Sequence, residues 1–357
     1  MKHVLCICLS VAMATSTWAF TPAMPGLTHR TLLKREGSKK HATWTTTQPS
    51  LVVPSRAMDQ TVGDGRVRVA SSSSILFQMT RPRTLPLSAI LLTTGAWGAE
   101  RNFAFLSNPP VMTQLVLMGA LVMLTTATSM LVNEYWDHKL DVDSHDSAPS
   151  DHPLVEGLVS PEQVKGLCKW LYAAHLGLLL LIQQSSLRMC IYLNTMATFL
   201  YTRYFKPIPG VKNLLCAGVI ATTVALGAAV VKGSLMTGAA AVWPAVVVVG
   251  GGIMHREIVM DVVDVHGDRK AGLRTLPVVF GQRRALLLSC APLLAAVAVT
   301  ATATAKPILS SAPLVVMCGL ALRAVQTVGT NDETKRMDSA IELAPLLLFT
   351  SMVFGLS

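Results

Sequence analysis

The sequence predicts an all-α membrane protein, a polytopic bundle of about nine transmembrane helices. The chain is 51% hydrophobic and only 14% charged. From Thr84 onward, long apolar runs follow one another with short polar breaks, and no soluble domain fits between them. Apolar runs of this length with few charges are typical of membrane helices. The helices are expected at nine segments: 85–106, 111–136, 165–183, 186–205, 213–231, 235–260, 283–304, 307–325 and 337–356.

Lysine and arginine support this count independently, because loops on the retained side of a membrane carry the excess of positive charge. From Arg81 onward, seventeen basic residues fall on the amino-terminal flank and on every second connection, and four fall on the opposite face. Those four are Arg101, Arg188, Lys232 and Lys306. The bias predicts which chain segments share one side of the membrane.

Residues 1–19 have the pattern of a signal peptide, with Lys2 before a short apolar stretch and small side chains at Thr17 and Ala19. Residues 20–78 are basic and rich in Ser and Thr, as in a transit segment without stable structure. Together they resemble the two-part presequence of algae with complex plastids. We therefore expect a multi-pass protein of a plastid (chloroplast) membrane, with the membrane-embedded domain at 79–357. A secretory signal before a disordered linker is the alternative.

The net charge of +10 does not indicate binding to nucleic acid. Residues 1–74 contribute nine bases and three acids, or +6, so the rest of the chain is only mildly basic. It has no basic patch interleaved with stacking aromatic side chains. Of the seven cysteines, two lie in the signal and five are scattered singly, so the sequence implies no disulfide framework or metal knuckle.

A first cluster of polar residues stands where the second apolar run ends. Asn133, Asp137 and Asp141 lie at i, i+4 and i+8, so in a helix they share one face. A carboxylate in the middle of a bilayer costs about 2.5–3.5 kcal/mol on insertion scales. A row of such groups at the end of a span therefore indicates a cation pathway or a metal site.

A second cluster ends the sixth apolar run, with Asp261, Asp264 and Asp268. On a continued helix these three also share a face, unless Gly267 ends the helix before Asp268. Twelve of the seventeen acids after residue 80 fall in 134–162 and 257–268, and both clusters lie on the positive face. In so apolar a chain, this concentration favours a site over solvated loops.

Other metal or phosphate sites fit the sequence less well. An EF-hand starting at Asp141 would have Asp146 at the turn glycine and His152 at the twelfth-position glutamate. The loop histidines lack the spacing of a zinc site. The glycine run 250–252 follows no strand, so we expect close helix contacts there instead of a phosphate loop.

Oxygen ligands of these types suit Mg²⁺, which binds through one or two carboxylates and completes its shell with water and substrate phosphate. Lysine and arginine on the same face can hold the remaining phosphate oxygens. The metal and the bases together make a diphosphate a better leaving group. Among apolar helices, this chemistry describes a pocket for a diphosphate with a hydrocarbon tail.

The motifs Asn133-x3-Asp137-x3-Asp141 and Asp264-x3-Asp268 resemble the two aspartate motifs of the UbiA superfamily of intramembrane prenyltransferases. The resemblance continues through three further stretches in the same order, so it covers most of the chain after residue 80. These stretches are HPLVEGLVS at 152–160, YTRYFKPIPGVKN at 201–213 and REIVMDVVDVHGDRKAGLRTLPVVFG at 256–281.

The resemblance implies a nine-helix bundle in which two Mg²⁺ ions bind a prenyl diphosphate in a central cavity. The implied metal site comprises Asn133, Asp137, Asp141, Asp261, Asp264 and Asp268. By the same resemblance, Lys206 contacts the diphosphate and Tyr201 the allylic cation or its departing oxygen. The implied reaction transfers the prenyl group to an aromatic or other lipid-quinone or pigment-precursor acceptor. A membrane terpene cyclase, or a non-enzymatic magnesium-binding carrier or scaffold, remains an alternative.

The sequence departs from the family pattern in three places. Glu134 replaces the aspartate common after the asparagine, and His152 stands where many members have an arginine. Tyr201 and Lys206 are five residues apart, where some members have four. The phosphate contact missing at His152 is then expected from another base, and Arg203 joins the catalytic set on this ground. The three candidates are Arg203, Lys212 and Arg274.

Both acidic clusters are predicted to face the same compartment. Cysteines introduced by Ser144→Cys and His266→Cys should react with a membrane-impermeant thiol reagent from the same side of sealed vesicles. Lys306→Cys, on the opposite face by the charge bias, should react only from the other side. Opposite accessibility of positions 144 and 266 would overturn both the helix count and the shared metal site.

Overall fold

The computed structural model describes residues 71–140, 152–330 and 333–356. Across these ranges the protein is helical and contains no β-strand, so the predicted fold class is confirmed. Within the described residues, a long helix lies over most of each of the nine predicted segments. These helices are α3 (Leu85–Glu100), α4 (Pro109–Lys139), α5 (Pro161–Leu179), α6 (Ser185–Leu200), α7 (Val211–Lys232), α8 (Leu235–Val263), α11 (Gln282–Ala303), α12 (Pro307–Thr327) and α13 (Glu333–Leu356). Helices α3, α5 and α6 end before the predicted segments do.

Five short elements join or precede the long helices. They are α2 (Ser72–Met79), η1 (Ala104–Ser107), the π-helix η4 (Tyr201–Phe205), α9 (Val265–Lys270) and α10 (Leu276–Phe280).

Six helices of the described ranges are long and apolar enough to cross a membrane. They are α4, α7, α8, α11, α12 and the Met337–Leu356 part of α13. Helices α3 and α6 have 16 residues each, or about 24 Å at 1.5 Å per residue, against a hydrocarbon core of about 30 Å. Helix α5 carries Glu162, Lys165 and Lys169 in its first half. The predicted number of nine crossings is therefore not confirmed.

Helix α2 precedes the long helices and crosses the predicted boundary at residue 79. It spans Ser72–Met79, so it overlaps the end of the segment 20–78, which we expected to lack stable structure. Its Met79 is buried against Leu131 of α4 and Val164 of α5, and Ser71 caps the helix by accepting a hydrogen bond from the Ser74 backbone. The predicted signal peptide and the transit segment up to residue 70 lie outside the described residues.

The ends of the helices follow local sequence signals. Ser160 and Gln163 form a capping box at the start of α5, with Pro161 in its first turn. Gly210 and Gly233, both with positive φ, stand on either side of α7, a conformation that side chains with a Cβ rarely adopt. Helix α8 is kinked near Pro244 because proline cannot continue the backbone hydrogen-bond ladder.

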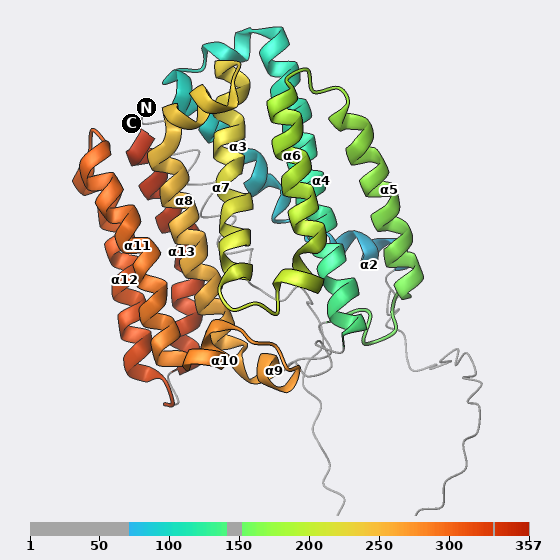
Figure 1. Ribbon diagram of the computed structural model, residues 1–357, viewed down its shortest axis with the longest axis vertical. Coiled ribbons are helices and arrows are strands. Elements are labelled where there is room, and N and C mark those ends of the chain that lie inside the picture. Colours follow the sequence, from blue (N-terminus) through green and yellow to red (C-terminus); the bar gives the residue numbers. More distant parts are fainter. Residues whose placement is uncertain (1–70, 141–151, 331–332, 357) are drawn as a thin grey trace, which may run out of the picture. The chain divides into compact units, whose positions relative to one another are not determined.

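Small residues let the central helices pack closely. Figure 1 shows α7 beside α8, and buried apolar side chains from both join those of α11, α12 and α13 in one cluster. A Cβ on Gly227 of α7 would lie 1.8 Å from the Leu92 carbonyl oxygen of α3. Close approach of this kind is the usual basis of helix packing inside membranes.

The glycine run 250–252 contributes to this packing as predicted. A Cβ on Gly251 would lie 2.6 Å from the Pro292 carbonyl oxygen of α11, and one on Gly252 would lie 1.7 Å from Leu348 of α13. The prediction of close helix contacts is thus confirmed for Gly251 and Gly252.

The bundle brings distant segments together at one end. The carboxyl end of α4, the linker between α6 and α7, and the short helices α9 and α10 all lie there (Figure 1). Because α4 and α8 run in the same direction through the bundle, the acidic residues at their carboxyl ends lie near the α6–α7 linker and the start of α7.

The α3–α7 contact gives a test of the packing. Gly227→Ala should lower the thermal unfolding midpoint of the protein in detergent, at a cost of about 1–3 kcal/mol for overpacking. Gly218→Ala, in the same helix but with nothing within 4 Å of its added Cβ, should leave the midpoint unchanged or raise it slightly. Equal midpoints for the two variants would contradict this helix packing.

Candidate functional site

The first acidic cluster lies at the carboxyl end of α4 and is neutralised by a lysine from the α6–α7 linker. Lys206 Nζ lies 2.6 Å from Asp137 Oδ1, and these side chains are only 11% and 7% exposed. Asn133 Nδ2 donates to the other oxygen of Asp137 at 2.7 Å. Thr202 Oγ1 donates to Asn133 Oδ1 at 3.0 Å. The cluster is thus a hydrogen-bonded network in which both carboxylate oxygens have donors.

The π-helix η4 explains the unusual spacing of Tyr201 and Lys206. The Lys206 backbone N–H donates to the Tyr201 carbonyl at 2.8 Å, an i→i+5 bond. A π turn holds one residue more than an α turn. In a π turn, residues five apart lie on the same side of the helix, as residues four apart do in an α-helix. The extra residue between Tyr201 and Lys206 is therefore accommodated by the π turn.

The second acidic cluster is neutralised in the same manner. Lys212, in the first turn of α7, forms an ion pair with Asp261 Oδ1, and these side chains are 12% and 2% exposed. Asn213 Nδ2 donates to Asp261 Oδ2 at 2.9 Å. Asn213 Oδ1 is buried and accepts no hydrogen bond from the described residues. A free acceptor oxygen thus lies beside a buried carboxylate.

The remaining acids of this cluster do not follow the prediction of one shared helical face. Helix α8 ends at Val263, and Asp264 lies outside helical geometry at φ −85° and ψ 4°. Asp264 is exposed, whereas Asp268 is buried and accepts a 2.8 Å hydrogen bond from Thr275 Oγ1. Burial raises the pKa of Asp268, against the charge of Lys212 and the bond from Thr275. The helix is therefore interrupted at Asp264, before Gly267.

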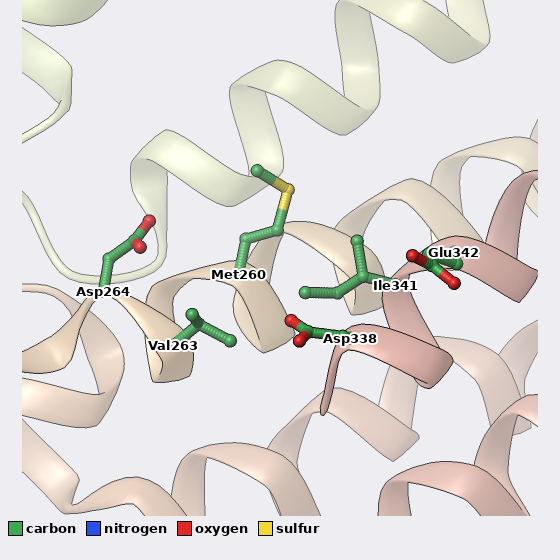
Figure 2. A pocket seen from close by; sticks show the side chains of 6 residues that line it. All are labelled: Met260, Val263, Asp264, Asp338, Ile341 and Glu342. Carbon is green, nitrogen blue, oxygen red and sulfur yellow. The ribbon is translucent and has the colours of Figure 1, made fainter. Parts of the chain in front are cut away.

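A cavity of about 310 Å³ lies between the end of α8 and the start of α13. Figure 2 shows Asp264 at one end of it, and Asp338 and Glu342 at the other. The sequence analysis did not single out these last two acids. Within the described ranges, no group of three or more His, Cys, Asp or Glu side chains is placed to hold a metal ion. The cavity therefore does not form a metal cage by itself.

The structure separates the predicted catalytic residues. Tyr201 lies within electrostatic reach of Cys216, Glu257 and Asp261, so it lies beside the second cluster. The Arg203 guanidinium is exposed and lies 4.8 Å from the ring centroid of Trp136, a cation–π distance. Of the three basic residues expected to replace the missing phosphate contact, Lys212 contacts an acidic cluster, whereas Arg203 and Arg274 are exposed.

The two substitutions in the family pattern lie next to each other. His152 Nδ1 is 3.5 Å from Glu134 Oε2, and Arg81 Nη2 is 3.6 Å from Glu134 Oε1. The Glu134 side chain, which is longer than that of aspartate, thus lies beside His152, the residue found where many family members have an arginine. This contact joins the α2–α3 turn, α4 and the segment before α5.

The donor atoms suit magnesium. Asp137, Asp261 and Asp268 offer buried carboxylate oxygens, and the unpaired Asn213 Oδ1 offers a neutral one. Mg²⁺ takes hard oxygen ligands and usually needs only one or two carboxylates, with water and substrate phosphate completing the octahedron. Asp141, the third member of the first predicted row, lies outside the described residues.

A model of the UbiA prenyltransferase family matches residues 88–351. The chain belongs to this family. It is 34% identical over 214 residues to the digeranylgeranylglyceryl phosphate synthase of Natronomonas pharaonis, a match that spans 60% of this chain and 72% of that protein. The match to the synthase of Halobacterium salinarum is 35% over 186 residues, or 52% of this chain and 61% of that one. The protein is therefore a prenyltransferase.

The fold is also that of solved UbiA homologs. The apo UbiA homolog of Aeropyrum pernix K1 superimposes with a TM-score of 0.58 at 21% identity, covering 75% of this chain and 98% of that one. The Archaeoglobus fulgidus homolog bound to GPP and Mg²⁺ gives 0.55 at 20% identity, over 79% of this chain and 98% of that one. The UbiA fold expected from the motifs is thus confirmed.

The sequence analysis missed the neutral residues that orient the acids. Thr202, Asn213 and Thr275 each donate a hydrogen bond to a member of the clusters. Their only sequence signal was their place inside the stretches 201–213 and 256–281. Side chains of this kind are common in helices and loops, so their role depends on the neighbour that the fold supplies.

The first cluster gives a test with a matched control. Asp137→Asn should lower prenyltransferase turnover by about 100-fold or more, because it removes a negative charge from the expected Mg²⁺-binding site. The loss corresponds to several kcal/mol of transition-state stabilisation. Asp338→Asn, across the cavity from Asp264, should retain full turnover. Turnover can be measured as diphosphate released by folded, monodisperse protein in detergent. Comparable activity of the two variants would show that Asp137 is wrongly assigned.

Proposed function

We propose that this enzyme transfers a prenyl group from an allylic prenyl diphosphate to a glyceryl phosphate that already carries one prenyl chain. Diphosphate is released, and Mg²⁺ is required. One observation carries the proposal: Lys206 of the α6–α7 linker pairs with Asp137 and Lys212 of the first turn of α7 pairs with Asp261, at the same end of an apolar bundle. Paired acids and bases of this kind suit a metal-bound diphosphate whose hydrocarbon tail lies among the helices.

In this proposal, the predicted metal ligands keep their roles. Asn133 and Asp137, with Asp141, form one half of the magnesium-binding site. Asp261, Asp264 and Asp268 form the other half, with Asp264 exposed where a hydrated ion can enter. When bound, Mg²⁺ neutralises the diphosphate and makes it a better leaving group.

The chain's own residues then perform the remaining tasks. Lys206 holds outer oxygens of the diphosphate, and Tyr201, beside the second cluster, faces the allylic carbon or the departing oxygen. The surrounding apolar helices exclude water, which would otherwise capture the cation. The bond from the allylic carbon to the diphosphate oxygen breaks, the glycerol hydroxyl oxygen bonds to that carbon, and the released diphosphate accepts the hydroxyl proton. No step is assigned to Arg203, whose guanidinium lies over Trp136.

The acceptor class rests on the relatives. The name digeranylgeranylglyceryl phosphate synthase describes a product with two geranylgeranyl chains on a glyceryl phosphate, which favours this acceptor over the aromatic ring expected from the sequence. The A. fulgidus homolog bound to GPP and Mg²⁺ supports the donor class and the metal. The plastid membrane stays a prediction, because these relatives are archaeal and residues 1–70 lie outside the described ranges.

The proposal can be tested with purified protein and geranylgeranyl diphosphate. Diphosphate release should be slow alone and much faster with glyceryl phosphate carrying one geranylgeranyl ether, and a chelator should abolish it. Mass spectrometry should find the doubly prenylated lipid.

The same assay distinguishes the alternative functions. Stimulation only by homogentisate, dihydroxynaphthoate, hydroxybenzoate or chlorophyllide would replace the proposed acceptor with an aromatic or pigment precursor. Fast release without any acceptor, giving a cyclic hydrocarbon, would identify a terpene cyclase. No release under any condition would leave a magnesium-binding carrier or scaffold.

A further inference from the structure

Lys212 occupies the same position in the second acidic cluster as Lys206 does in the first. Each ammonium pairs with a buried carboxylate, and each side chain is almost fully enclosed. Lys212 also lies within the electrostatic reach of Asp268 and Glu257. The family resemblance gives Lys206 its role directly, whereas it makes Lys212 only one of three candidates for the phosphate contact missing at His152.

A divalent cation bound to Asp261 would weaken the ion pair of Lys212. The Lys212 ammonium and the metal would then share one carboxylate, and their like charges would repel each other at close range. The lysine ammonium stands on four flexible carbons, so it can rotate to another anion. In a site that binds a metal diphosphate, the nearest new anion is a phosphate oxygen.

The neighbouring residue supports this exchange independently. Asn213 uses its amide N–H to hold the other oxygen of Asp261, while its own oxygen is buried without a donor. A buried acceptor without a donor is unfavourable. Water coordinated to a cation at Asp261 would donate to this oxygen. A hydrated cation would therefore satisfy an acceptor that the ion pair with Lys212 leaves unpaired.

We propose that Lys212 is a diphosphate-binding residue that exchanges partners: it neutralises Asp261 while the site holds no divalent cation, and it binds the donor's diphosphate once a cation binds Asp261. The inference rests on the proposed function, because it takes the metal diphosphate from there. It predicts effects of opposite sign on metal and diphosphate binding. A lysine that only stabilised the fold would change both in the same direction.

Lys212→Met, which keeps a long side chain without the charge, tests this exchange in the purified full-length protein. Mn²⁺ alone should bind about tenfold more tightly, because no ammonium competes for Asp261. Inorganic diphosphate, in the presence of saturating Mg²⁺, should bind about tenfold more weakly, because one charge-assisted hydrogen bond is lost. Electron paramagnetic resonance and calorimetry measure the two affinities. Lys212→Arg should restore most of the diphosphate affinity.

Lys232→Met is the matched control. Lys232 ends the same helix, pairs with Glu100 at 3.1 Å and is 35% exposed, so its loss should change neither affinity. If both affinities fall in Lys212→Met, or neither changes, the exchange is wrong.

A measurement on the unmodified protein covers the case in which Lys212→Met does not fold. The reactivity of Lys212 toward an acetylating reagent, read by mass spectrometry against Lys232, should rise with Mg²⁺ alone and fall when diphosphate is added. Constant reactivity would also overturn the exchange.

Neither binding experiment needs a prenyl donor or an acceptor, so failures of the two proposals are distinguishable. Opposite shifts without prenyl transfer would refute the proposed function and leave the exchange intact. Prenyl transfer with parallel shifts would do the reverse.

Discussion

Carboxylates at the ends of apolar helices must be neutralised, and most of the architecture around the site serves this constraint. Removing one partner of a buried ion pair destabilises a protein by about 3–5 kcal/mol, because the other charge is left uncompensated. Asp137 on α4 and Asp261 on α8 are both buried, and each receives a lysine ammonium. Lys206 lies in the connection between α6 and α7 and Lys212 in the first turn of α7, so the path of the chain through residues 206–212 determines whether either cluster is stable.

The backbone of the connection is shaped to place these two lysines. The π turn at Tyr201–Phe205 adds a residue before Lys206, and Gly210 takes a left-handed conformation just before α7 begins. Lys212 and Asn213 then fall in the first turn of α7, where both reach Asp261. Short π turns are frequent at functional sites. In a regular helix, one of the two lysines would face away from the carboxylate that it contacts here.

The rest of the bundle holds the clusters in a fixed relation. Close contacts of Gly227 with α3 and of Gly251 and Gly252 with α11 and α13 leave little room for the helices to slide. At the periphery, Glu134 connects Arg81 with His152. Two of the departures from the family pattern, Glu134 and His152, thus lie beside each other, with Glu134 Oε2 3.5 Å from His152 Nδ1.

The helices and the polar residues at their ends could be predicted from the amino-acid sequence alone. Apolar runs predicted all nine long helices of the described residues, because helix formation and membrane burial depend on composition along the chain. The same runs did not reveal α2, whose few apolar residues become significant only against α4 and α5. Tertiary structure alone decided that Lys206 meets Asp137 across 69 residues and that Asn213 meets Asp261 across 48. It also decided that the helix breaks at Asp264. Which residues so far apart in sequence form a hydrogen bond or ion pair depends on how the helices pack, and no local sequence pattern indicates it.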